Sequence, residues 1–306
     1  MAALLVRKPG LLTTGQDLGR AGLGRFGVSA SGAMDPLALR VANRLVGNPD
    51  GTAALEITAV GPELEFTGRA CFALAGANLS PQLDGRALEV WRSVTATAGQ
   101  VLSFGPRRQG ARCYLAAAGG LALPRVFGSA ATDLESGLGG GALRAGQEIG
   151  IGEAGDRPPR SVRPALLRLY AAPFELRFVP ETASGPGHDA AQRLAAAPYR
   201  VSSRSNRMGY RLEGPPLAAG GDGGQLSEPI APGTIQLPAG GEPILLMADR
   251  PTVGGYPRLG QVIAADLPKA GQLWIGHAVR FRPVTPEDAR MALAAMAALL
   301  ERAVAE

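Results

Sequence analysis

A loop rich in glycine, serine and charged residues contains the highest concentration of candidate functional residues in this sequence. Residues 16–35 read QDLGRAGLGRFGVSASGAMD. Glycines permit backbone shapes and close approaches that other residues resist, so polar side chains on such a loop can surround a ligand. We therefore interpret the loop as the rim of a site for a small polar ligand. Its candidate residues are Gln16, Asp17, Arg20, Ser29, Ser31, Gly32 and Asp35.

A second polar cluster, SSRSNRMGYR, occupies residues 202–211. Guanidinium groups suit carboxylate or phosphate recognition. If the segment is extended, Arg204 and Asn206 share one face and Arg207 lies on the other. A solvated edge strand, whose charges prevent aggregation, explains the pattern equally well. The candidate residues are Arg204, Asn206, Arg207 and Arg211.

A third cluster, DRPTVGGYP, follows the apolar segment PILLMA and occupies residues 249–257. Adjacent glycines beside an aromatic and an acid are typical of a binding loop at the end of a strand. A Gly-Gly hairpin with Tyr256 packed on it is the equal alternative. The candidate residues are Asp249, Gly254, Gly255 and Tyr256.

Three familiar motifs are disfavoured. Residues 22–27 match GxGxxG, but the required strand before it and helix directly after it are missing. Neither lysine, Lys8 or Lys269, completes a Walker A loop. A Ser-His hydrolase is disfavoured because GVSASGA is not a nucleophile elbow and both histidines lie in glycine-containing turns.

Composition indicates an ordinary globular protein. Of 306 residues, 46% are hydrophobic and 19% charged, which excludes a disordered chain. The net charge of +5 comes from scattered arginines, with aromatics at 5%, so we predict no nucleic-acid partner. No apolar run is long enough for a membrane helix and no signal peptide is evident, so we expect no membrane association and a cytoplasmic location. Cys71 and Cys113 are expected to be buried free thiols.

Short strands between Gly, Pro and Asp turns predict a mainly β protein. Asp84-Gly85 predicts a two-residue hairpin. One helix is predicted after Asp35 as N-cap, with Pro36 at its first position and Gly47 at its end. A C-terminal helix is predicted after Thr285, with Asp288 completing a capping box and an apolar stripe serving as a packing face. The predicted strands are 64–66, 71–75, 94–97, 101–104, 113–117, 174–179, 235–237, 244–247, 261–264 and 279–282.

Two β domains are expected. AGQVLSFG at residues 98–105 is echoed by AGQEIGIG at 145–152, and each is a glycine turn that leads into a strand. The segment EAGDRPPRSVRPALLRLYAAP is rich in Pro and Arg and is the best linker candidate. We predict an N-terminal domain at 1–155, a linker at 156–173 and a C-terminal domain with the last helix at 174–306.

Several long motifs in the same order resemble the allophanate hydrolase subunit 2 family, from about Thr14 to Phe281. The motifs that carry the resemblance are QDLGR, SGAMDPLALRVANRLVGN, ALE at 54–56, the strand at 144–152, SNRMGYRLEG and DRPTVGGYP. The resemblance implies two cyclophilin-like β-barrel domains with a few short helices and a C-terminal helix. The family pattern near the third cluster is QTTGGYP, whereas this chain has Pro251 and Val253 instead of Gln and the second Thr.

The family includes the C subunit of bacterial 5-oxoprolinase, which the free-standing two-domain form resembles most. The resemblance implies ATP-driven opening of the 5-oxoproline lactam to glutamate, together with a KipI-type B subunit and an A subunit of the same enzyme. Mg²⁺ is expected with the ATP, although no residues are assigned to a metal. Such a site needs cations for anionic groups, for which Arg20, Arg204, Arg207 and Arg211 are candidates. It also needs carboxylates to hold a metal or move protons, for which Asp17, Asp35 and Asp249 are candidates, although Asp35 also serves as a helix cap.

Two alternatives remain open within this family. One is a KipA-type regulatory protein that captures a kinase inhibitor resembling the B subunit. The other is the carboxyltransferase component of a biotin-dependent carboxylase. Neither lysine lies between methionines, so no covalently bound biotin is expected on this chain.

Overall fold

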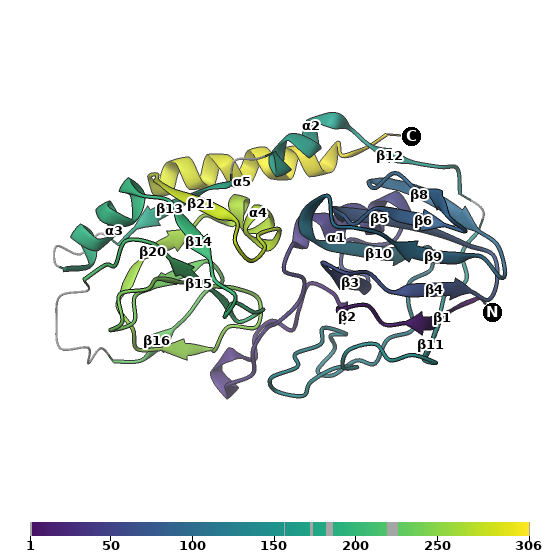
Figure 1. Ribbon diagram of the computed structural model, residues 1–306, viewed down its shortest axis with the longest axis horizontal. Coiled ribbons are helices and arrows are strands. Elements are labelled where there is room, and N and C mark those ends of the chain that lie inside the picture. The colour runs from purple at the N-terminus through teal and green to yellow at the C-terminus, as the bar shows by residue number, and fades with distance from the viewer. Residues whose placement is uncertain (1, 156, 172–173, 182–185, 219–225, 306) are drawn as a thin grey trace. The chain divides into compact units, whose positions relative to one another are not determined.

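The computed structural model describes residues 2–155, 157–171, 174–181, 186–218 and 226–305 (Figure 1). The chain divides into two compact units, which are described separately. The first contains Met1–Arg20, Ser31–Leu169 and Leu299–Glu306, and the second Ala21–Ala30 and Tyr170–Ala298. The mainly β class predicted from the sequence is confirmed.

The first unit contains two sheets. One has the strand order β11(Glu148–Gly150), β1(Ala3–Lys8), β4(Glu63–Phe66), β9(Val101–Phe104), β6(Pro81–Leu83) and β7(Arg86–Ala87). The other has the order β2(Leu12–Gln16), β3(Ala54–Thr58), β10(Gln109–Ala117), β5(Ala70–Asn78), β8(Arg92–Ala96), β12(Ser161–Val162) and β22(Val304–Ala305). Alternate side chains of both sheets, such as Leu4, Phe66, Phe72 and Leu115, belong to one hydrophobic core.

Helix α1(Pro36–Leu45) packs against β5 and β10. This packing explains why eight consecutive residues of β10 are buried, since both faces of the strand are covered. The predicted cap is confirmed, because Ala38 N donates to Asp35 Oδ1 at 2.9 Å and Pro36 is the first helical residue. Gly47 follows the helix with φ +72°, as a terminating glycine should.

The predicted hairpin at Asp84-Gly85 is also confirmed. It joins β6 to β7, and both turn residues have positive φ, 48° and 77°. The side chain of Asp84 accepts hydrogen bonds from Val101 N and Gln100, which ties the hairpin to β9.

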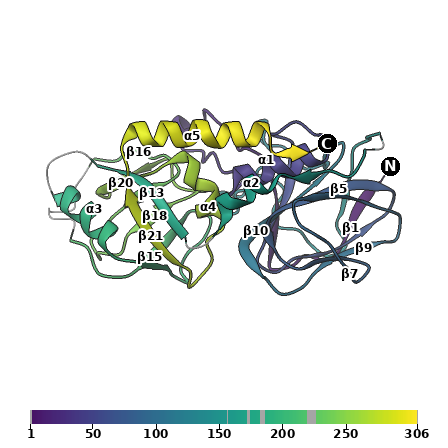
Figure 2. The same ribbon diagram turned by 90° about the horizontal axis from the view of Figure 1, so that it is seen from above.

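The second unit contains a closed barrel, several of whose strands are labelled in Figure 2. Its strand order is β13(Phe174–Pro180), β20(Arg258–Val262), β17(Thr234–Gln236), β18(Ile244–Leu246), β15(Gly209–Glu213), β14(Tyr199–Val201) and β21(Ala278–Pro283). A separate two-stranded sheet joins β16(Glu228–Pro229) to β19(Val253–Gly254). The remaining helical elements are η1(Gly24–Phe26), α2(Pro164–Leu167), η2(Arg168–Tyr170), α3(Pro186–Ala196), η3(Ala264–Asp266), α4(Leu267–Gly271) and α5(Pro286–Glu301).

The segment predicted as a linker carries structure of its own. β12 pairs with β8 and β22, and α2 follows it, so much of residues 156–173 belongs to the first unit. The contacts divide the chain between Leu169 and Tyr170, and they return residues 299–306 to the first unit. A Pro- and Arg-rich composition did not prevent Ser161 and Val162 from forming a strand between β8 and β22.

The capping box of α5 is confirmed, since Thr285 N donates to Asp288 Oδ2 at 3.0 Å and Asp288 N donates to Thr285 Oγ1 at 3.1 Å. The predicted stripe on this helix is half-buried in the structure, since Ala289, Ala292, Met296 and Leu299 are partly buried at helical spacing. Leu300 is the buried residue of α5, whereas Met291 is 64% exposed and Leu293 43% exposed.

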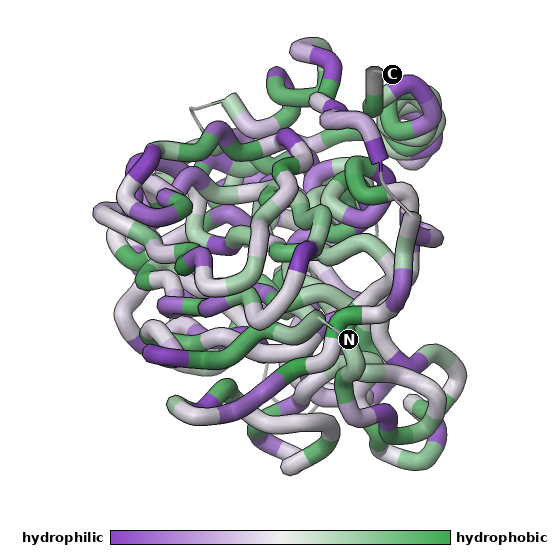
Figure 3. The backbone as a smooth tube through the Cα atoms, turned by 90° about the vertical axis from the view of Figure 1, so that its right-hand side faces the viewer, coloured by the Kyte–Doolittle hydropathy of each residue, from purple (hydrophilic) through white to green (hydrophobic). Residues whose placement is uncertain are grey.

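No helix in the described ranges is long and apolar enough to cross a membrane. In Figure 3, which colours the backbone by hydropathy, hydrophobic and hydrophilic stretches are interspersed along the chain. Both cysteines are free, but only Cys113 is buried as expected, while Cys71 is partly exposed.

Candidate functional site

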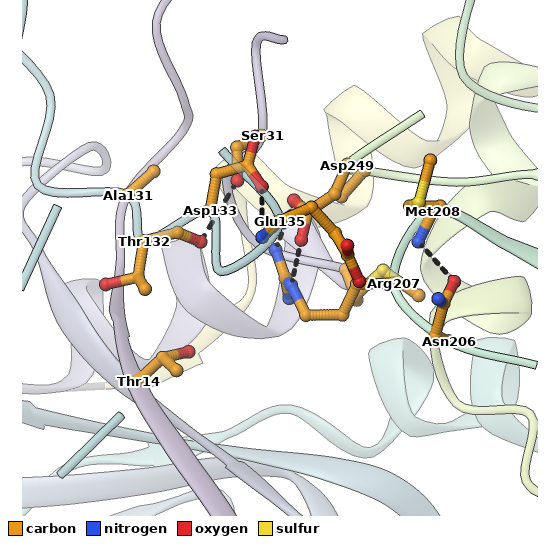
Figure 4. Close-up of polar contacts among 12 residues, drawn as sticks. Thr14, Ser31, Ala131, Thr132, Asp133, Glu135, Asn206, Arg207, Met208 and Asp249 are labelled. Carbon is orange, nitrogen blue, oxygen red and sulfur yellow. Dashed lines mark hydrogen bonds and ion pairs between the residues drawn. The ribbon is translucent and has the colours of Figure 1, made fainter. Parts of the chain in front are cut away.

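The first polar cluster begins where β2 ends. Gln16 is the last residue of β2 and is fully buried. Its Nε2 donates to Thr132 O at 2.9 Å and to Thr14 Oγ1 at 3.1 Å. Thr132 N donates to Gly15 O at 3.0 Å, so the strand end and residue 132 lie side by side (Figure 4).

Arg20 follows in the same cluster and is 2% exposed. Its Nη2 donates to the carbonyl of Ala131, the residue next to the one that receives Gln16. Two consecutive carbonyls therefore orient a buried guanidinium and a buried amide. Gly139, whose added Cβ would lie 2.8 Å from Ala131 O, allows the neighbouring turn to support this segment closely.

Four buried polar atoms of this cluster have no hydrogen-bond partner in the described chain. They are Gln16 Oε1, Arg20 Nε, Arg20 Nη1 and Thr132 Oγ1. Nearly all buried polar groups in folded proteins are satisfied, and a buried unpaired charge costs several kcal/mol. Two donors on a cation and two acceptors concentrated in one place are therefore a ligand-site signature.

Asp17 holds the loop in shape. Its Oδ1 accepts from Gly19 N at 2.8 Å and Ser129 Oγ at 2.6 Å, and its Oδ2 accepts from Ala130 N at 2.7 Å. The carboxylate is thereby committed to backbone and hydroxyl donors, which is a positioning role. Its proposed role in proton transfer stays a prediction.

Ser31 and Gly32 turn the chain back toward this cluster. Ser31 has φ +52°, and its Oγ donates to Thr132 O at 3.2 Å. Gly32 has φ +94°, and a Cβ added there would lie 2.8 Å from Gly19 N. Only glycine allows the two arms of the loop to approach this closely.

Ser29 belongs to the other compact unit, in the stretch Ala21–Ala30, and is partly buried. Residues 24–26 form η1 instead of a nucleotide-binding turn, and the guanidinium of Arg25 lies 4.7 Å from the ring centroid of Phe26. Both side chains are exposed.

Asp35 lies in a buried polar network at the start of α1. Its backbone N donates to Tyr114 Oη at 2.8 Å, and Tyr114 Oη donates to Glu56 Oε2 at 2.6 Å. Glu56 Oε2 also accepts from Met34 N at 2.9 Å, and Arg112 Nε lies 3.8 Å from Glu56 Oε1. Burial, and then the charge of Glu56, raise the pKa of Tyr114 well above its usual value. Asp35 therefore acts as a helix cap in this structure.

In the second unit, Arg207 and Asp249 form a bidentate ion pair. Arg207 Nε lies 2.7 Å from Asp249 Oδ2, and Nη2 lies 3.0 Å from Oδ1 (Figure 4). Asp249 N also donates to Arg207 O at 3.0 Å. The structure thus joins the second and third sequence clusters, which lie 42 residues apart.

Residues 202–208 of the second cluster form a loop with turns, and the extended segment begins only at Gly209, in β15. Asn206 Oδ1 accepts from Met208 N at 2.9 Å, which favours a turn because it satisfies the backbone locally. Arg204 is exposed and pairs with Glu242 at 2.6 Å. Arg211 lies exposed on β15. The solvated-surface interpretation therefore describes Arg204 and Arg211 in this structure.

After the buried Asp249, the third cluster forms a short strand and a turn that are partly exposed. Gly254 ends β19, and a Cβ there would lie 2.8 Å from Gln236 Nε2 and closer still to Ile230. Gly255 is half-buried, and Tyr256 is 50% exposed instead of packed. Arg250 donates to Ile230 O at 3.1 Å, and burial lowers the pKa of its guanidinium, against the charge of Asp249.

The described residues provide no cluster of ligands for the Mg²⁺ that was expected with ATP. Among the described residues, no group of three or more His, Cys, Asp or Glu could hold an ion. Lys8 pairs with Glu63, and Lys269 donates to Glu175 O, so neither lysine belongs to the polar clusters. We therefore derive no step through a metal held by this chain.

The sequence missed the segment Ser129–Asp133, which completes the first cluster. Its small and polar letters, SAATD, resemble any loop. Only the hydrogen bond between Gln16 and Thr132 reveals that this segment belongs to the cluster, and these two residues are 116 positions apart in the sequence.

Residues 26–283 match the family model described as "Carboxyltransferase domain, subdomain A and B", and the chain belongs to this family. This chain is 39% identical to the C subunit of 5-oxoprolinase from Escherichia coli over 294 residues. The alignment covers 94% of this chain and 93% of that protein. The family resemblance stated from the motifs is thereby confirmed.

Larger proteins also contain a region similar to this chain. A putative urea carboxylase of Emericella nidulans is 35% identical, with 95% of this chain matching 25% of that protein. The crystal structure of the Kluyveromyces lactis urea amidolyase aligns with a TM-score of 0.89 and 28% identity, covering 98% of this chain and 20% of that one. This chain spans a fifth to a quarter of these two proteins.

Proposed function

We propose that this chain is the C subunit of an ATP-dependent 5-oxoprolinase and acts with the A and B subunits to open 5-oxoproline to glutamate. The similarity to the C subunit of 5-oxoprolinase along nearly the whole of both chains supports the assignment. The observation that carries it is the buried guanidinium of Arg20, whose Nε and Nη1 have no hydrogen-bond partner among the described residues. Gln16 Oε1 and Thr132 Oγ1, in the same cluster, are also unpaired.

The unpaired atoms match the polar groups of this substrate. 5-Oxoproline carries a carboxylate, which accepts charge-assisted hydrogen bonds from a guanidinium. Its ring also carries an amide N–H, which an amide or hydroxyl oxygen accepts. We assign the carboxylate to Arg20 and the ring N–H to Gln16 Oε1 or Thr132 Oγ1. The ligand reaches these atoms after a local opening, because all four are buried.

The nucleotide supplies a phosphoryl group that turns the lactam oxygen into part of a leaving group. We assign the nucleotide to no residue of this chain. What this chain contributes is substrate orientation: Asp17 shapes the loop, and the carbonyls of Ala131 and Thr132 fix Arg20 and Gln16. A substrate held in this way presents its ring carbon in one orientation.

The test is glutamate release from 5-oxoproline and ATP by this chain mixed with the A and B subunits, with each of the three proteins left out in turn. We expect release that requires this chain. Arg20→Met should raise the KM for 5-oxoproline at least ten-fold, since a charge-assisted hydrogen bond contributes about 1.5–3 kcal/mol. Arg25→Met, on the exposed part of the same loop, is the matched control and should leave KM unchanged.

No glutamate from the three-protein mixture would overturn the assignment. Glutamate release with an unchanged KM for Arg20→Met would keep the activity but reject the role of Arg20. The free energy of unfolding should not fall in Arg20→Met, because the change removes an unpaired buried charge. That measurement separates substrate binding from loss of fold.

A second candidate function is the carboxyltransferase component of a biotin-dependent carboxylase. The match to a carboxyltransferase family and to a putative urea carboxylase favours it. Activity that requires a biotinylated partner and is abolished by avidin would support this function over the first.

A further inference from the structure

Residues 139–141 are three consecutive glycines that lie against the polar cluster of the first unit, and we call them the glycine strap. A Cβ added at Gly139 would lie 2.8 Å from Ala131 O and 3.1 Å from Thr132 Oγ1. Ala131 O is the carbonyl that accepts a hydrogen bond from Arg20. The glycine strap therefore lies directly on two atoms of the cluster.

The chain is fixed to its surroundings on both sides of the glycine strap. Before it, Asp133 N donates to Leu138 O at 2.9 Å and Leu138 N donates to Asp133 O at 3.0 Å, which closes a compact turn. After it, Leu143 N donates to Thr13 O at 2.9 Å, which ties the chain to β2. Movement of the glycine strap is thus confined between two anchored points.

The middle of the glycine strap is held by few interactions. Within the described chain, the backbone of Gly139 and that of Gly140 make no hydrogen bond. Glycine has no side chain to bury, and Gly140 is exposed. Segments with few buried contacts and few hydrogen bonds open at a low cost in free energy. The glycine strap can therefore move while the two sheets of the unit stay folded.

Thr132 lies beneath the glycine strap with its hydroxyl unsatisfied. The residue is 1% exposed, and its Oγ1 has no hydrogen-bond partner among the described residues. A buried hydroxyl without a partner is unfavourable. The closed position of the glycine strap keeps this hydroxyl unpaired, so a ligand that reaches it gains a hydrogen bond that the free protein lacks.

We propose that the glycine strap is the gate of the ligand site. It covers Thr132 in the free protein and is displaced when a small polar ligand binds to Thr132 Oγ1. The identity of this ligand as 5-oxoproline rests on the proposed function, whereas the movement of the glycine strap does not. Because only the open form binds, the apparent affinity is reduced by the fraction of the free protein that is open.

The movement is measured with Thr132→Cys, which places a thiol beneath the glycine strap. Its alkylation by iodoacetamide is followed by peptide mass spectrometry, which separates it from the two native cysteines. Cys113 is fully buried in the core of the same unit and reports unfolding of that unit. We expect the introduced thiol to react about 100-fold faster than Cys113, because local opening costs less than unfolding. Equal rates would overturn the proposal.

Gly139→Ala in the same background should favour the open form, because its Cβ would lie 2.8 Å from Ala131 O in the closed one. Gly137→Ala is the matched control, since Gly137 also has positive φ, +66°, but has no atom within 4 Å of an added Cβ. We expect Gly139→Ala to speed alkylation of the introduced thiol about ten-fold more than Gly137→Ala does, with the rate at Cys113 unchanged. Equal effects of the two substitutions would overturn the proposal.

With Thr132 in place, Gly139→Ala should lower the half-saturating concentration of 5-oxoproline in the three-protein mixture by a similar factor, about ten-fold. Simple damage to the site would raise this concentration. A raised or unchanged value would overturn the role as a gate. If the unsubstituted mixture releases no glutamate, the proposed function is rejected, while the alkylation rates still decide whether the glycine strap opens.

Discussion

Arg207 and Asp249 are joined by two short hydrogen bonds, of 2.7 and 3.0 Å, with both side chains buried. The pair connects the turn before β15 with the residues that follow β18. A buried carboxylate and guanidinium are stable together because each supplies the counter-charge that water no longer provides.

Asp249→Asn should therefore destabilise the protein by about 3–5 kcal/mol, because it removes the carboxylate charge that pairs with the buried guanidinium of Arg207. Urea unfolding followed by circular dichroism measures this free energy. The exposed pair Arg204–Glu242 provides the control, and Glu242→Gln should cost less than about 1 kcal/mol. Equal losses in the free energy of unfolding for the two substitutions would contradict the prediction that burial makes the Arg207–Asp249 pair the more important for stability.

Tyr114→Phe should lower the free energy of unfolding by about 1–3 kcal/mol. The change removes the hydroxyl that donates to Glu56 and accepts from Asp35 N, and it leaves both buried groups short of a partner. Tyr256→Phe, at a half-exposed ring, is the control and should be nearly neutral. A neutral Tyr114→Phe would mean that the network rearranges around the missing hydroxyl.

Gly32→Ala should destabilise the loop more than Gly22→Ala does. Both glycines have positive φ, +94° and +84°, so both substitutions add backbone strain of about 1–3 kcal/mol. Only Gly32 also brings the new Cβ within 2.8 Å of Gly19 N, whereas Gly22 faces open space. The difference between the two variants in thermal unfolding isolates the close approach, and identical stabilities would contradict it.

Stability should fall at alkaline pH partly through Cys113. Burial raises the pKa of its thiol from 9.0 to about 12 in the folded protein. Below pH 9 both states keep the proton and the full stability is present. Between pH 9 and 12 the unfolded chain loses the proton first, so the free energy of unfolding falls by up to about 1.4 kcal/mol per pH unit.

The measurement for this effect is the pH dependence of urea unfolding between pH 9 and 10. Cys113→Ala removes the titrating group and should flatten the slope, although the variant starts from lower stability because of the lost volume. An unchanged slope in Cys113→Ala would assign the alkaline sensitivity to other groups, such as Tyr114.

Local rules in the sequence determined much of the fold. The strand alternation, the Asp84-Gly85 turn, the Asp35-Pro36 helix start and the Thr285–Asp288 capping box were all predictable, because each depends on residues a few positions apart. Long motifs in order also identified the family.

The tertiary structure alone decided which polar residues meet. Nothing local in SAATD indicates that Ala131 and Thr132 orient Arg20 and Gln16, or that Asp249 neutralises Arg207. These contacts join segments separated by 42 to 116 residues, and strand pairing and burial bring them together. The tertiary structure likewise left Arg204 at the surface in an ion pair with Glu242, although the sequence offered it as a candidate site residue.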